Sequence, residues 1–204
     1  MNLSRITLRP LKLSDVDDFM VVAGDDRVTR YTRWNTFVSR EQALTFIRDH
    51  QHPWTRAICV DDVTIGYVSV SPGSGDDRCR AEIGCYIATD YWGQGIATEA
   101  TKIAASQVFK DLPGLVRLQA FVAVENKASQ RVLEKAGFLR EAILKSSLIL
   151  IAIIKELVSN LLKYGVGFNW VERKRHEACV DRQHYSLAQK MREQAKEFEA
   201  SSFL

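Results

Sequence analysis

Two glycines in the stretch 91–98, Tyr-Trp-Gly-Gln-Gly-Ile-Ala-Thr, stand between a β-rich segment and a helical one. Glycine lets the backbone come close to a ligand. A helix that begins at Gly95 would present free N–H groups and the positive end of its dipole. Such a turn binds an anion without any side-chain charge, and a pyrophosphate is the natural guest. The same glycines would also suit a tightly packed strand–helix connection, and the glycines alone do not separate these two interpretations.

The segments around this turn must position it. Apolar residues from Ile96 to Val108 recur with helical spacing, so we expect a long amphipathic helix that starts at Gly95. Asn126 and Gly137 suit the two ends of a later helix, because they are preferred at helix N-caps and C-caps respectively. The order β-α-α-β-β-β-α-β-α-β indicates an α/β chain with a mixed, mainly antiparallel sheet. The predicted strands are 4–9, 57–60, 64–70, 81–88, 117–124 and one opening at Phe138. Asp61-Asp62 is expected to join 57–60 to 64–70 as a hairpin. The predicted early helices are 14–20, capped by Ser14, and 39–50, which begins with a Ser39/Gln42 capping box.

Three motifs lie in order along the chain. The first is Ile6-Thr7-Leu8-Arg9-Pro10, and the second is residues 81–86, Ala-Glu-Ile-Gly-Cys-Tyr, followed by the glycine turn through Ala100. The third is residues 126–129, Asn-Lys-Ala-Ser, with residues 134–138, Glu-Lys-Ala-Gly-Phe. Together they resemble the GNAT superfamily of acyl-CoA N-acetyltransferases, specifically its RimJ/RimL-like branch, from about residue 4 to about 146. The resemblance implies the GNAT fold, a mixed sheet with helices on both faces.

The resemblance also implies where acetyl-CoA, the cosubstrate, would bind. The fourth and fifth strands of the family splay apart, and the acetyl thioester lies between them. The pantetheine arm would pair with the backbone at the end of the fourth strand, at Ile87, Ala88 and Thr89. The pyrophosphate would lie on the turn and the start of the following helix, at Gln94, Gly95, Ile96, Ala97 and Thr98. Asn126 would bond the pantetheine amide or the backbone, or would only cap its helix.

Acetyl transfer requires a neutral amine. An α-amino group with a pKa of about 7.8 is partly neutral near pH 7.5, whereas a lysine is only about 0.1 % neutral, a deficit of roughly 4 kcal/mol. Glu82 is the candidate base, since it resembles the catalytic glutamate that several members carry on this strand; pairing with Arg78 or Arg80 is the structural alternative. Leu133 stands where many members have the tyrosine that protonates the leaving thiolate. Ser129 is the candidate proton donor in its place, or it only supports the first helical turn.

The expected activity is direct transfer of acetyl from acetyl-CoA to an amine, either a protein N-terminus or a small molecule. Tyr31, Trp34 and Phe37 fall where the family walls its acceptor site, although local packing between two helices explains them equally well. The alternative function is an acyl-CoA-binding protein with little or no turnover. It rests on the C-terminal sequence, which lacks the Gly and Asp of the family's last β-hairpin.

That C-terminal sequence predicts a GNAT domain over 1–146 and a divergent, helical extension over 147–204. Residues 147–162 carry too many apolar side chains to stay in water, so the segment must pack against something. We expect a strand through about Leu150 and a helix from about Ile151 to Lys163. The helix would rest on the sheet edge left by the missing last strand. An uncovered edge, an unfilled acceptor site and self-association through this segment would follow.

Composition excludes several other classes of protein. Of the 204 residues, 28 are Lys or Arg and 25 are Asp or Glu, and a net charge of +3 disfavours a nucleic-acid binder. The four cysteines form no CxxC pair, which favours a reduced chain in the cytoplasm, with the nucleus as the other possibility. The longest apolar run, 148–154, is too short to cross a membrane. We expect no metal site, because the sets His50/His52 and His176/Cys179/His184 lack ligand-like surroundings.

Overall fold

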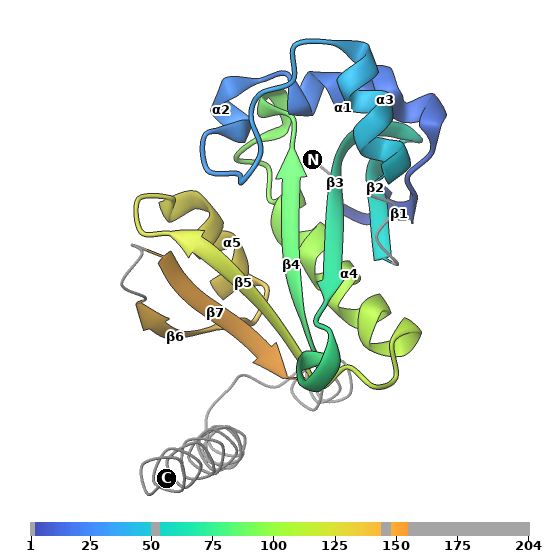
Figure 1. Ribbon diagram of the computed structural model, residues 1–204. Coiled ribbons are helices and arrows are strands. Elements are labelled where there is room, and N and C mark those ends of the chain that lie inside the picture. The colour runs from blue at the N-terminus through green and yellow to red at the C-terminus, as the bar shows by residue number, and fades with distance from the viewer. Residues whose placement is uncertain (1–2, 50–53, 144–147, 155–204) are drawn as a thin grey trace, which may run out of the picture. The chain divides into compact units, whose positions relative to one another are not determined.

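The computed structural model describes residues 3–49, 54–143 and 148–154, which form one compact unit (Figure 1). Its strands are β1 (Ile6–Pro10), β2 (Trp54–Val60), β3 (Val63–Pro72), β4 (Arg80–Ile87), β5 (Arg117–Ala123), β6 (Leu139–Ile143) and β7 (Leu148–Ile154). Its α-helices are α1 (Val16–Ala23), α2 (Asp26–Thr29), α3 (Arg40–Asp49), α4 (Ile96–Asp111) and α5 (Lys127–Lys135). Short 3-10 turns are η1 (Leu3–Arg5), η2 (Leu13–Asp15), η3 (Gly75–Asp77) and η4 (Thr89–Tyr91).

Within the described residues, the strands form one seven-stranded sheet in the order β1-β2-β3-β4-β5-β7-β6. Every neighbouring pair is antiparallel except β4 and β5, which run parallel. This arrangement confirms the expected mixed, mainly antiparallel sheet. Asp61 and Asp62 connect β2 to β3 with positive φ values of 50° and 66°, the backbone that a tight two-residue hairpin needs, so the predicted hairpin is confirmed.

Helices cover both faces of the sheet. On one face α1 packs on β3, where the rings of Phe19 and Tyr67 lie 4.9 Å apart, and Tyr86 of β4 stacks on Tyr67 at 4.7 Å. Cys85, the residue before Tyr86, points to the opposite face because side chains alternate along a strand. There it meets Thr101 of α4; burial raises the pKa of the Cys85 thiol to about 12, and the Thr101 hydrogen bond opposes this. The largest fully buried side chains are Trp54, Tyr67, Phe19, Phe138, Ile47, Ile58, Ile65, Ile96, Leu118 and Ile151.

Local signals located most element boundaries. Gly95 and Asn126 are the N-cap residues of α4 and α5, as predicted. Ser14 is not a cap, because residues 13–15 form η2 and α1 begins only at Val16, with Asp15 as its N-cap. Of the expected capping box before α3, the structure shows one bond, from the Gln42 N–H to the Ser39 hydroxyl at 3.3 Å.

The C-terminal strand differs from the expectation. β7 lies between β5 and β6 and pairs with both, so Ile151 faces Ala120 on one side and Arg140 on the other. Ile151 and Ala152 are adjacent and both almost fully buried, at 0 % and 2 % exposed, so β7 is covered on both faces. The predicted helix from Ile151 is therefore wrong over 151–154, which are strand. A hairpin-forming last strand is present, and the edge of β5 is covered.

The physical reason is that a strand buried on both faces reads as a continuous apolar run, which periodicity alone does not distinguish from a buried helix. The rest of the expected extension, 155–204, and the self-association assigned to it lie outside the described residues. The domain boundary near residue 146 stays a prediction, although β7 carries the sheet beyond it. Among the described residues, no helix combines the length and the apolar character needed to cross a bilayer.

Candidate functional site

The two parallel strands in the middle of the sheet separate soon after they start. β4 and β5 pair only over Arg80–Glu82 and Arg117–Gln119, although β4 continues to Ile87 and β5 to Ala123 (Figure 1). In the ladder with β3, alternate residues of β4 turn their N–H and C=O groups away from β3. Beyond Glu82, no strand among the described residues lies beside these groups on the β5 side, so this half of β4 can accept an extended ligand along its backbone. The expected splaying of these strands is present.

The turn after β4 leads into the N-terminus of α4. Gly93 and Gly95 have φ values of +74° and +82°, which L side chains rarely adopt. A Cβ at Gly93 would meet nothing within 4 Å, and one at Gly95 would meet only the side chain of Leu3 at 3.9 Å. Tight packing is therefore not the reason for these glycines. They are needed for the backbone conformation, and they leave the surface beside the helix start accessible.

The first turn of α4 presents backbone N–H groups that an anion could accept hydrogen bonds from. The N–H groups of Ile96, Ala97 and Thr98 have no hydrogen-bond acceptor within the helix, because they belong to its first turn. The Glu99 N–H is the first that bonds a carbonyl one turn earlier, that of Gly95 at 3.1 Å. Gln94 and Gly95 are exposed directly in front of this turn. The helix is 16 residues long, so its dipole adds to the attraction for negative charge. These groups fit a pyrophosphate, which is the ligand the sequence predicted here.

The predicted pantetheine-binding residues already use most of their backbone groups. The Trp92 indole N–H donates to the Ile87 carbonyl at 2.8 Å, and the carbonyls of Ala88 and Thr89 accept from the N–H groups of Tyr91 and Trp92. The Ala88 N–H bonds β3. Among the three residues, this leaves the N–H groups of Ile87 and Thr89 for a ligand. Their assignment to pantetheine stays a prediction.

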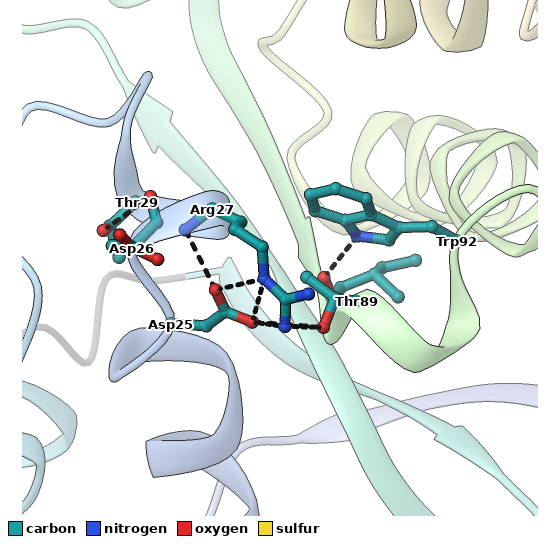
Figure 2. A network of polar contacts seen from close by, with 7 residues as sticks. Asp25, Asp26, Arg27, Thr29, Thr89 and Trp92 are labelled. Atoms are coloured by element: carbon teal, nitrogen blue, oxygen red, sulfur yellow. Dashed lines mark hydrogen bonds and ion pairs between the residues drawn. The ribbon is translucent and has the colours of Figure 1, made fainter.

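A polar network ties α2 to this turn (Figure 2). Arg27 donates to the Asp25 carboxylate at 2.6 Å and to the Thr89 hydroxyl at 2.7 Å, and Thr89 donates to Asp25 at 3.1 Å. The Arg27 hydrogen bond is the largest cause that lowers the pKa of Asp25, to about 2. Asp25 also caps α2 by accepting the Arg27 N–H. The network therefore fixes the segment before α2 against η4, at the end of β4.

Glu82 lies at the point where β4 and β5 begin to separate. Its carboxylate pairs with Arg33, from the segment between α2 and α3, at 3.1 Å, and not with Arg78 or Arg80 as the structural alternative proposed. Arg80 pairs with Asp77 instead. The Glu82 side chain is 37 % exposed, so it remains accessible to a substrate.

Beside Glu82 on the same face of β4 lies Tyr86. Its ring folds back over Gly84, where an added Cβ would come within 2.7 Å of the Tyr86 hydroxyl, so only glycine fits under it. Burial raises the pKa of Tyr86, and the negative charge of Glu82 adds to this effect. The Tyr86 phenol is therefore protonated at neutral pH. Trp34 packs 5.9 Å from Tyr86 and Phe37 packs 5.2 Å from Trp34, in the aromatic cluster between the helices and the sheet.

Tyr31, the third aromatic residue assigned to the acceptor wall or to local packing, is 42 % exposed with Arg30 over its ring at 5.0 Å. Trp34 and Phe37 thus have a packing role in the structure. A contact with substrate stays a prediction for all three residues.

Asn126 and Ser129 follow the far end of β5. The Asn126 side chain accepts the Ser129 N–H at 3.0 Å, so Asn126 does cap α5. The Ser129 hydroxyl makes no hydrogen bond within the described residues and remains available as a donor. Leu133 is buried at 7 % exposure and belongs to the core. Neither Asn126 nor Ser129 contacts Glu82, because both follow β5 whereas Glu82 lies on β4, and the two strands separate.

Sequence reasoning did not assign a role in the site to four residues that connect β4 to the helical segments, namely Asp25, Arg27, Arg33 and Tyr86. Arg33 lies 49 residues from its partner Glu82, and Asp25 lies 64 residues from its partner Thr89. No local pattern in the sequence signals contacts between residues so far apart. The described residues hold no group of His, Cys, Asp and Glu suited to a metal ion. The two histidine sets considered from the sequence lie outside them.

Comparison with known proteins agrees with this geometry. Residues 5–139 match the family model described as an acetyltransferase (GNAT) domain. The N-acetyltransferase YoaA of Bacillus subtilis, itself uncharacterized, is 31 % identical over 152 residues, which cover 69 % of this chain and 83 % of YoaA.

Two solved structures share the fold. Spermidine N-acetyltransferase of Vibrio cholerae, in complex with CoA and spermine, has a TM-score of 0.68 at 20 % identity and covers 77 % of this chain and 99 % of its own. The RimL ribosomal L7/L12 alpha-N-protein acetyltransferase, in complex with CoA, has a TM-score of 0.64 at 19 % identity, with coverages of 74 % and 94 %. The separating strands, the helix start with its free N–H groups and the match of the family model over most of the sheet agree: the chain belongs to the GNAT family of acetyl-CoA-dependent N-acetyltransferases.

Proposed function

We propose that this chain transfers acetyl from acetyl-CoA directly to the primary amine of a peptide N-terminus or a small molecule, with Glu82 as base and Ser129 as proton donor. The observation that carries the proposal is the separation of β4 and β5 beyond Glu82. Glu82 lies on β4, the strand that leads into the turn proposed to bind the pyrophosphate. An acetyl thioester lying along β4 would bring its carbonyl toward Glu82.

The cosubstrate site follows from the helix start and the free strand. The N–H groups of Ile96, Ala97 and Thr98 would hold the pyrophosphate, with Gln94 and Gly95 beside it. The pantetheine arm would use the N–H groups of Ile87 and Thr89 at the end of β4, and Asn126 its free amide nitrogen. The bound acetyl-CoA supplies an activated acyl group, and the protein's task is to orient the amine and move two protons.

The proton balance assigns the two residues. The acceptor ammonium gives one proton to the Glu82 carboxylate, and the neutral nitrogen then attacks the thioester carbonyl to form the new C–N bond. As the C–S bond breaks, the Ser129 hydroxyl donates its proton to the departing sulfur. The nitrogen loses its second proton to water, and water returns a proton to Ser129, so that one proton ends on the thiol and the other on Glu82. Glu82 matters most for lysine-like amines, because these are neutral only about 0.1 % of the time near pH 7.5.

Two acceptor classes are consistent with the comparisons. The branch resemblance to RimJ and RimL favours a protein N-terminus, and the likeness to the RimL structure is consistent with it. The equally similar spermidine acetyltransferase keeps a small-molecule amine in the proposal. The rival function, an acyl-CoA-binding protein without turnover, depended on a missing last hairpin. Since β6 and β7 form that hairpin, we do not propose it.

A panel of amines tests the proposal. Thiol release from acetyl-CoA is measured with α-amino peptides, lysine-like amines and polyamines, each with the wild-type chain and with Glu82→Gln. We expect release with at least one amine, and a larger loss in Glu82→Gln for lysine-like amines than for α-amines. Release that never exceeds the rate without amine would refute the transferase activity. Equal rates for wild type and Glu82→Gln on every amine would refute Glu82 as the base.

A further inference from the structure

Arg33 connects the two strands that separate. Its guanidinium lies 3.1 Å and 3.5 Å from the two carboxylate oxygens of Glu82 on β4, and 6.0 Å from the ring centre of Phe121 on β5. Glu82 is in register with Gln119, which shares a face of β5 with Phe121, so both contacts lie on one face of the sheet. Arg33 therefore lies across the separating strands on the side where the candidate base is found.

The backbone that carries Arg33 is held on both sides. The Thr32 hydroxyl bonds the carbonyls of Thr29 and Trp34, each at 2.7 Å, and the Trp34 ring packs against Tyr86. The position of the Arg33 side chain at Glu82 is thus set by the fold of the α2–α3 connection.

The guanidinium itself is weakly held. The Arg33 side chain is 74 % exposed and Glu82 is 37 % exposed, and ion pairs as exposed as this contribute little to stability. Another cation can therefore displace Arg33 from Glu82. The guanidinium of Arg33 carries a positive charge, so Arg33 holds this place as a cation and does not itself accept the acetyl group.

We propose that Arg33 determines acceptor specificity by occupying, at Glu82, the position that the ammonium of the acceptor must take. The inference rests on the proposed function, since it assumes that the acceptor amine approaches Glu82. A primary ammonium enters by exchange: it takes the guanidinium's place on Glu82, and Arg33 turns into the solvent. Acceptors without a positive charge gain nothing from this exchange and are disfavoured.

Binding of a simple dication tests this inference without requiring turnover. The dissociation constant of 1,4-diaminobutane for the protein–CoA complex is measured by NMR titration for the wild type and Arg33→Gln. Removing the competing guanidinium should tighten binding by about 2- to 5-fold, the factor that corresponds to an exposed ion pair. Arg30→Gln is the matched control, because Arg30 lies in the same segment over Tyr31 and has no contact with Glu82. It removes the same charge and should leave the dissociation constant unchanged.

The double variant Arg33→Gln/Glu82→Gln should lose the gain, because the tighter binding needs the Glu82 carboxylate. Unchanged or weaker binding in Arg33→Gln would overturn the inference. So would an equal gain in Arg30→Gln, which would show a general effect of charge. In the transfer assay, Arg33→Gln should lower KM for cationic acceptors by about the factor by which it tightens diamine binding. Tighter diamine binding without transfer in any variant would uphold the role of Arg33 and refute the proposed function.

Discussion

Replacing Gly95 with alanine tests whether the start of α4 binds the pyrophosphate. Gly95 has a φ of +82°, so alanine there costs about 1–2 kcal/mol of conformational free energy. The new methyl would meet only Leu3 at 3.9 Å, so the free protein bears no added steric cost. If the pyrophosphate binds here as proposed, that methyl would lie beside the N–H groups that the phosphates approach. We expect CoA affinity in a calorimetric titration to fall at least about tenfold, or ~1.4 kcal/mol.

Gly93→Ala is the matched control for this experiment. Its φ of +74° demands the same conformational cost and its Cβ would meet nothing, but it lies two residues before the N-cap. Both variants should lower the melting temperature by a similar amount, roughly 2–8 °C. Gly93→Ala should weaken CoA binding by less than about threefold. Equal losses in the two variants, or unchanged affinity in Gly95→Ala, would refute the assignment of the pyrophosphate to this helix start.

Three further variants test the proposed proton donor, the Asp25 network and the ion pair between β5 and β6. Ser129→Ala should reduce the rate of thiol release and leave CoA affinity nearly unchanged in calorimetry, because the hydroxyl acts on the departing sulfur; equal rates in the two proteins would count against its role as donor. Asp25, held by Arg27, has its pKa lowered to about 2, so its contribution to stability is full above about pH 4 and is lost as the pH falls toward 2. In Asp25→Asn, the free energy of unfolding should fall less between about pH 4 and pH 2 than in the wild type, by about 1 kcal/mol after allowance for solvent screening. Melting temperatures measured as a function of pH would show this smaller decrease. Arg117 pairs with Glu141 across β7 with both side chains nearly buried, so Arg117→Ala should lower the free energy of unfolding in urea by about 3 kcal/mol. A loss below about 1 kcal/mol would show that the pair is dispensable.

Local sequence signals located the parts of the site that depend on short stretches of chain. The helix start at Gly95, the cap at Asn126 and the turn at Asp61-Asp62 each need a backbone conformation or a hydrogen bond that only a few residue types provide. The sequence left two interpretations of the glycine turn open, tight packing and anion binding. The open space around Gly93 argues against tight packing, and anion binding stays a prediction.

Contacts between distant segments could not be predicted in the same way. The structural alternative to a catalytic Glu82 paired it with the nearby Arg78 or Arg80, but its partner is Arg33, 49 residues away. Nothing in the pattern around Arg33 signals this pairing, because it depends on how α2 and α3 dock on the sheet. β7 illustrates the second difficulty, since Leu148–Ile154 is equally apolar on both faces and only its pairing with β5 and β6 shows that it is a strand.

Backbone amide shifts on titration with CoA test the central claim most directly. If the pyrophosphate lies on the start of α4 and the pantetheine along β4, the largest changes will fall on the N–H groups of 96–98 and on the second half of β4, from Ile83 to Ile87. Residues of α3, which packs mainly on α1, should shift little. Saturable binding with unchanged amides at 96–98 would contradict the account, because CoA would then be bound elsewhere.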